Sequence, residues 1–196
     1  MIPLKRSLLL VVTLTGLLPS WAAIDTSFSE AKLGQGSEVV LQSPDKRWKI
    51  RTVKPTSDDG DMRVYLRGVN DTHEHLLTEY FRTAGVIWSP DSRTIIFLDE
   101  HSAEDTRVKV FRVEPSGATA VGNADASLRR FVRSKLGRSR ILFVVLQVSG
   151  FNGGRDAIFD LTITYLKYPQ KDGPSAEMNA RISLNLRSYT VNQIGT

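Results

Sequence analysis

Short runs of alternating apolar and polar residues dominate the chain from about residue 38 onward. Residues 62–67 and 159–165 alternate strictly between the two classes. A period of two places every second side chain on the same face of a strand. The runs are short and are separated by Pro, Gly, Ser and Asp, as in antiparallel strands joined by turns. The pattern therefore predicts an all-β protein.

One turn sequence occurs twice, first as Ser43-Pro44-Asp45 and again as Ser89-Pro90-Asp91. Proline fixes φ near −65° at the second turn position, and the flanking Ser and Asp can bond to nearby backbone, so each sequence predicts a tight reversal. Residues 38–83 and 84–122 share one order of strand, reversal, strand, polar loop, strand and strand. The spacing of the two copies is close to the 40–45 residues of a propeller blade.

The pattern changes after residue 122. Apolar residues recur at helical spacing over residues 125–136 and Gly137 follows, which predicts one helix. Residues 141–146 are apolar on both faces and predict a fully buried central strand. With the alternating runs that follow, residues 123–196 are expected to form a third, altered unit.

The expected fold is all-β with one helix, built from three consecutive antiparallel β-meander units that resemble propeller blades. Because a closed propeller needs about four blades, the arrangement is an incomplete propeller. We expect a monomer in which the helix at residues 125–136 caps the sheets. A homodimer that combines three units from each chain is the alternative.

The second copy carries a family resemblance. Trp88 precedes the reversal, a basic residue follows it, and Ile95 and Phe97 alternate in the next strand. This resembles the WD-like blades of periplasmic Tol-type β-propellers and of prolyl oligopeptidase propeller domains. The first copy lacks the preceding Trp, and Lys46 and Ser92 stand where the family usually has glycine. The resemblance covers about two blades and implies a fold without an activity.

The first 22 residues have the order of a secretory signal peptide. Lys5 and Arg6 precede an apolar run at residues 8–12, and the small residues Ser20 and Ala22 suit a cleavage site. The apolar core spans about ten residues, whereas a membrane-spanning helix needs about 20. We therefore expect a single β-rich domain over residues 23–196, periplasmic or secreted, with a polar lead-in at residues 24–37 and no transmembrane segment.

Charge and cysteine content narrow the classes of partner. The formal net charge is +5, and it falls to +3 without Lys5 and Arg6. This surplus is too small to indicate nucleic-acid binding. The chain has no cysteine, which excludes a disulfide framework and a cysteine nucleophile. We expect the partner to be another protein or an envelope component.

Candidate contact residues lie in the glycine-rich stretch at residues 150–155. The sequence predicts a flexible loop with Phe151 at its tip and Asn152 and Arg155 beside it, because aromatic and arginine side chains often anchor interfaces. A strand follows instead of a helix, which argues against a phosphate-binding loop. A basic helix face is expected either to meet an acidic partner or anionic lipid or to be simply solvated. It comprises Arg129, Arg130, Arg133, Lys135, Arg138 and Arg140.

Two groups of residues have side chains that can bind metal ions. His73 and His75 share a strand face and, with His101 as a third ligand, offer the donors of a zinc site, but they lack a specific second shell. The sequence favours a polar strand entry beside a turn, so no metal site is expected. The acidic loop at residues 58–61 lacks the ligand spacing of a calcium loop and is expected to be a solvated hairpin. Glu100, Glu104 and Asp105 occupy the matching loop of the second unit, so the two loops together are expected to form an acidic rim.

The expected function is a non-enzymatic, exported protein-binding module of the cell envelope, with no cofactor. The sequence contains no Gly-x-Ser-x-Gly elbow, and its histidines lie in no catalytic motif. One alternative is an inhibitor or immunity-type protein that blocks an exported enzyme. The other is a metal-dependent enzyme that uses the three histidines.

Overall fold

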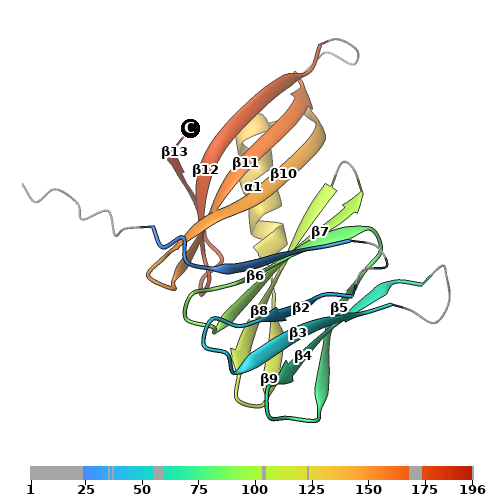
Figure 1. The fold of residues 1–196 in the computed structure, drawn as a ribbon. Helices are drawn as coiled ribbons and strands as arrows, with labels where there is room; N and C mark the ends of the chain where they lie inside the picture. Colours follow the sequence, from blue (N-terminus) through green and yellow to red (C-terminus); the bar gives the residue numbers. More distant parts are fainter. Residues whose placement is uncertain are drawn as a thin grey trace, which may run out of the picture.

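The computed structural model describes residues 24–34, 36, 38–54, 60–102, 105–122, 124–167 and 174–195. They form an all-β fold with one helix (Figure 1). In chain order the elements are β1 (Ser29–Leu33), β2 (Val40–Gln42), β3 (Trp48–Val53), β4 (Met62–Gly68), β5 (Glu74–Tyr80), β6 (Thr83–Trp88), β7 (Thr94–Ser102), β8 (Asp105–Glu114), β9 (Gly117–Val121), α1 (Ala124–Leu136), β10 (Arg140–Asn152), β11 (Asp156–Leu166), β12 (Ala176–Asn185) and β13 (Val191–Gly195).

The strands form three antiparallel meander units, as the sequence predicted. The first unit has the order β2-β3-β4-β5, the second β6-β7-β8-β9 with β1 added beside β6, and the third β10-β11-β12-β13. The second and third units meet through one parallel bridge, between Asp105 and Val144. The sheets do not close into a ring, so the fold is an incomplete propeller.

The second unit is the middle layer of the molecule (Figure 1). Side chains of β7 alternate between its two faces: Ile95 and Phe97 pack against the first unit, whereas Ile96 and Leu98 pack toward the third unit and α1. All four are buried. An apolar run of this kind fits a strand covered on both faces.

Helix α1 follows the second unit and packs into the hydrophobic core between the second and third units. Leu128 and Val132, one turn apart, are buried there. The helix ends where Gly137 takes a φ of 57° and donates its N–H to the carbonyl of Arg133 at 2.8 Å. The predicted helix is thus confirmed. In the described part of the chain this helix is neither long nor apolar enough to cross a membrane.

Strand β10 corrects one expectation. Residues 141–146 were predicted to be buried on both faces, yet Phe143 is 39% exposed and Val145 is 56% exposed. The reason is the layer order. Within the described residues only α1 and the inner core cover this part of the third unit, so the opposite face of β10 meets solvent, and the doubly covered strand is β7 instead.

Residues 24–33, which were predicted to be part of a polar lead-in, contain a strand that pairs with the second unit. β1 pairs with β6, and Leu33 at its end is buried. Before β1, the N–H of Asp25 donates to the carbonyl of Phe151 at 2.7 Å, and Phe28 meets the Phe151 ring edge-on at 5.8 Å. A Cβ on Gly150 would clash with the side chain of Ile24, so glycine permits this approach. The segment ties the second unit to the third.

An ion pair on the first unit gives a pH-dependent contribution to stability. Arg51 donates to both carboxylate oxygens of Glu74, at 3.0 and 2.6 Å. The hydrogen bonds from Arg51 hold the pKa of Glu74 below its ordinary value of 4.5, although desolvation opposes them. A depressed folded-state pKa stabilises the fold above the unfolded pKa, and this contribution is lost as the pH falls through the folded value.

We therefore expect Glu74→Gln to lower the free energy of unfolding at pH 7 by about 0.5–1 kcal/mol, since the pair is partly exposed. The difference from wild type should shrink as the pH falls below 4.5. Urea unfolding at a series of pH values measures it. Glu177→Gln, at an exposed position of β12, is the control; a pH-independent loss in Glu74→Gln would contradict the prediction.

Candidate functional site

The reversal between β2 and β3 is built by its own side chains. The hydroxyl of Ser43 donates to Asp45 Oδ1 at 2.7 Å and accepts the N–H of Trp48 at 3.0 Å. The same carboxylate oxygen accepts the N–H of Arg47 at 3.0 Å. The N–H of Lys46 donates to the Ser43 carbonyl at 2.9 Å, which closes the turn. Ser43 is buried at the base of this network.

The reversal between β6 and β7 repeats these bonds. The hydroxyl of Ser89 donates to Asp91 Oδ1 at 2.6 Å and accepts the N–H of Thr94 at 2.9 Å. Asp91 Oδ1 accepts the N–H of Arg93 at 3.1 Å, and the N–H of Ser92 donates to the Ser89 carbonyl at 2.9 Å. The two Ser-Pro-Asp turns therefore share one structure.

The two turns lie against each other. Lys46 and Ser92, the residues after each Asp, have φ values of 62° and 58°, in the region that favours glycine. In this chain the Ser92 hydroxyl accepts the N–H of Asp45 at 3.0 Å, so a side chain at this position joins the first unit to the second.

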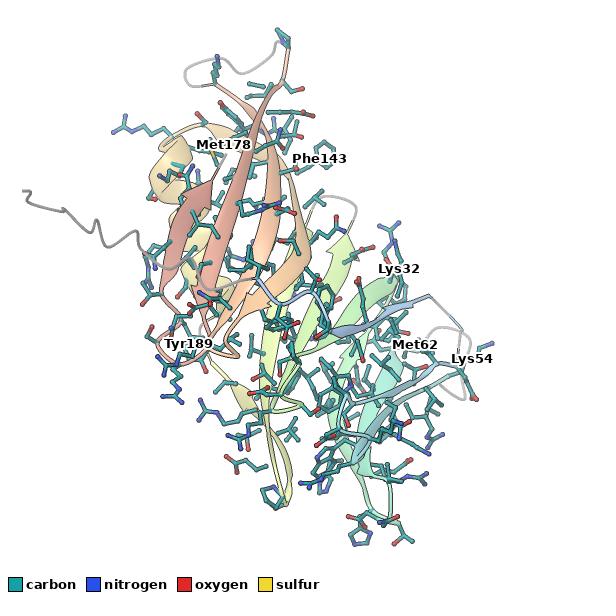
Figure 2. All side chains as sticks on the ribbon, turned by 60° about the vertical axis from the view of Figure 1, so that its left-hand side comes forward. Lys32, Lys54, Met62, Phe143, Met178 and Tyr189 are labelled. Carbon is teal, nitrogen blue, oxygen red and sulfur yellow. The ribbon has the colours of Figure 1, made fainter. Side chains whose placement is uncertain are left out.

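A large cleft lies where the turns of all three units converge, and we call it the turn-end cleft. Its volume is about 1540 Å³. The β12–β13 turn reaches it from the third unit; Figure 2 shows Tyr189, which follows that turn, and Met178 toward the other end of the same unit. The lining residues are Asp45, Lys46, Arg47, Trp48, Gly68, Val69, Asn70, Asp71, Asp91, Ser92, Arg93, Thr94, Arg112, Val113, Glu114, Pro115, Gly154, Leu186 and Arg187.

Three carboxylates of the cleft hold turns together. Asp45 and Asp91 bond within the Ser-Pro-Asp turns, and Asp71 accepts the N–H of His73 at 2.9 Å. Desolvation raises the pKa of Asp45, but the bonds from Ser43, Arg47 and Ser92 outweigh it and the pKa lies below its ordinary value. The bond from His73 likewise lowers the pKa of Asp71. These two groups stay ionised at neutral pH.

The basic side chains of the cleft differ from its carboxylates in their bonding. Lys46, Arg93, Arg112 and Arg187 are exposed, and their side chains have no hydrogen-bond or ion-pair partner among the described residues. The N–H of Val113 donates to the carbonyl of Arg93 at 2.8 Å, which fixes the end of β8 beside the second turn. The cleft thus offers charged donors to a ligand while most of its acceptors serve the backbone.

An aromatic ring adds apolar surface to the cleft. Trp48 begins β3 directly after the first turn and faces Gly68 across the strand pair. The ring is half-buried and packs against the hydrophobic core between the first and second units. Aromatic and arginine side chains together are the commonest anchors of protein interfaces.

No protein family model, curated protein or solved structure matches this chain.

The contact residues predicted at 150–155 are only partly at this surface. Phe151 is 0% exposed and lies in the core, which corrects its assignment as a contact residue. The predicted flexible loop is the end of β10 and a tight turn, in which Gly153 and Gly154 have φ values of 55° and 67°. Arg155 is exposed and Asn152 is half-buried.

This turn nevertheless borders the turn-end cleft. A Cβ on Gly154 would lie 3.1 Å from Asp91 Oδ2, so the turn rests against the second Ser-Pro-Asp turn. The N–H of Leu186 donates to the carbonyl of Arg155 at 2.8 Å. The predicted contact stretch is therefore close to the turn-end cleft, although the side chains of Phe151, Asn152 and Arg155 do not line the cleft.

The histidines do not form a metal centre in the described residues. No group of three or more His, Cys, Asp and Glu side chains there has the geometry to hold an ion. The ring of His75 lies over Gly117, where a Cβ would come within 3.2 Å of its atoms. His73 is exposed, and the side chain of His101 lies outside the described residues.

Part of the predicted acidic rim lies outside the described residues. Asp58, Asp59 and Glu104 lie outside the described residues, as does the side chain of Asp105. Glu100 belongs to β7 and accepts a hydrogen bond from the Thr83 hydroxyl. β7 and β8 extend to Ser102 and from Asp105, so much of the stretch expected to be a loop is strand.

Sequence reasoning missed the arginines of the cleft. Arg93 follows the second turn, Arg112 lies near the end of β8, and Arg187 follows β12. One signal was available: in a meander, alternate turns lie at the same end of the sheet, so basic residues at alternate turns share an end. That signal does not show that the ends of three units meet.

Proposed function

We propose that this chain is a non-enzymatic, exported module of the cell envelope that binds an acidic segment of another protein in the turn-end cleft. The observation that carries this proposal is a set of cations without a side-chain partner in the described part of the chain, beside carboxylates that are held by turns. These cations are Lys46, Arg93, Arg112 and Arg187. The fold resemblance to propeller blades supports a binding role by analogy. The signal-like residues 1–22 support export.

A protein segment suits this surface better than a uniform polyanion. Asp45, Asp71, Asp91 and Glu114 line the same cleft as the cations. Fixed carboxylates would repel the phosphates of a nucleic acid at several points along its backbone. A peptide with carboxylates at a few positions can place them on the arginines and its apolar residues on Trp48. Charge complementarity of this kind sets partner choice and association rate.

A double charge reversal tests the site. We expect Arg93→Glu/Arg112→Glu to weaken binding of a glutamate–tyrosine copolymer by about tenfold or more. The matched control is Lys32→Glu/Arg82→Glu, which changes net charge equally at exposed positions on β1 and in the β5–β6 turn. Fluorescence anisotropy at fixed salt measures affinity, and thermal unfolding checks that each variant folds.

Two results would overturn the proposal. One is an equal loss in the cleft variant and the control, which would mean that only net charge matters. The other is tighter binding of duplex DNA than of the copolymer by the wild type. Sequencing the N-terminus of the protein recovered from cells tests export separately, since an intact Met1 would contradict it.

A further inference from the structure

A second, smaller cavity lies between α1 and the beginning of β10, outside the turn-end cleft. Its volume is about 370 Å³, which is within the range of small-molecule sites. Its floor is apolar and its rim carries charges. The lining residues are Thr106, Asp125, Leu128, Arg129, Val132, Arg133, Ile141, Leu142, Val144, Leu146 and Leu161.

The cavity extends along the first half of β10. Its lining runs from Ile141 to Leu146, a span of about 15 Å at the rise of a strand. Leu128, Val132 and Leu161 are buried beneath it, whereas Ile141 is only partly buried. A single amino-acid side chain is too short to fill such a slot. An unbranched hydrocarbon chain fits its length and its apolar floor.

The rim has a cation held in place by the backbone. Arg133 Nη1 donates to the carbonyls of Gly137 and Ser139, both at 3.2 Å. Its Nε and Nη2 groups have no partner among the described residues. The guanidinium is thus anchored on one side and retains donors for a carboxylate, the acceptor that fits its planar fork.

The acidic group on the rim is already neutralised. Asp125 Oδ2 pairs with Arg129 Nε at 2.7 Å, and Asp125 Oδ1 accepts the N–H of Val108 at 3.2 Å. Arg133 therefore supplies the surplus charge, and the rim favours an anionic head group.

We propose that this cavity binds a fatty acid, with the hydrocarbon chain along β10 and the carboxylate on Arg133. The proposal does not depend on the function of the turn-end cleft. It combines two features that are separate in the sequence, an apolar slot formed by α1 and β10 and a basic residue fixed at its mouth.

Calorimetric titration of the full-length or processed protein with decanoate, decan-1-ol and acetate tests the proposal. We expect one decanoate to bind per chain, at least tenfold more tightly than decan-1-ol, and acetate not to bind measurably. Arg133→Gln, which removes the guanidinium and keeps a polar side chain, should weaken decanoate binding about tenfold and leave decan-1-ol binding unchanged.

Arg130→Gln is the matched control, since Arg130 is an exposed arginine of the same helix that does not line the cavity. It should bind decanoate as the wild type does. Equal affinity of the wild type for decanoate and decan-1-ol would overturn the proposal, as would an equal loss in both arginine variants. Absence of saturable decanoate binding would overturn it regardless of any variant.

Discussion

Phe151→Ala is expected to lower the free energy of unfolding by about 3–5 kcal/mol, the range for removing a buried aromatic ring. Phe151 is 0% exposed and contacts Phe28, and its backbone exchanges hydrogen bonds with Asp25. Loss of the ring leaves a cavity where the N-terminal segment joins the third unit. Urea unfolding of the purified variant measures the change.

Arg155→Ala is the comparison, because Arg155 lies in the turn that follows β10 and is exposed. A surface substitution of this kind usually changes stability by no more than about 0.5 kcal/mol. Phe151→Leu, which keeps most of the apolar volume, should fall between the two. A Phe151→Ala protein as stable as Arg155→Ala would mean that Phe151 is not a core residue.

Ser89→Ala is expected to cost about 2–3 kcal/mol, which is large for the loss of one oxygen atom. The hydroxyl is fully buried, donates to Asp91 and accepts the N–H of Thr94. Its removal leaves the N–H of Thr94 without this acceptor at the base of a buried strand. Thermal or urea unfolding gives the value.

The repeat supplies an internal check. Ser43→Ala should show a similar loss, because the same bonds surround Ser43 in the first unit. Ser116→Ala, at an exposed position of the β8–β9 turn, should change little. If Ser43→Ala and Ser89→Ala differed by several kcal/mol, the two turns would not be energetically equivalent despite their matching bonds.

The reversals could be predicted because their bonds are local. Ser43, Asp45 and Trp48 lie within six residues, and the carboxylate and hydroxyl bond to the backbone of their own turn. The alternating apolar and polar runs likewise predicted the strands of the first two units, and the helical spacing of apolar residues predicted α1. Lys46 and Ser92 follow the Asp of each reversal, and both adopt the backbone conformation that glycine usually supplies.

The environment of each strand could not be predicted in the same way. The apolar runs in β7 and β10 look alike in sequence, yet β7 is covered on both faces while Phe143 and Val145 of β10 are exposed. The local sequence pattern shows how many faces of a strand are apolar. Whether each face is buried depends on which other layer of the molecule packs against it. The order of the three units therefore decided which run became the central strand.

The sequence alone determined the β-rich class, the repeated Ser-Pro-Asp turns and the single helix, because these follow from interactions between residues close in the chain. Tertiary structure decided that Phe151 is buried and that Arg93, Arg112 and Arg187 share one cleft. These positions are set by how separate sheets stack and where their turns meet. Such contacts join residues far apart in sequence, so no local pattern encodes them.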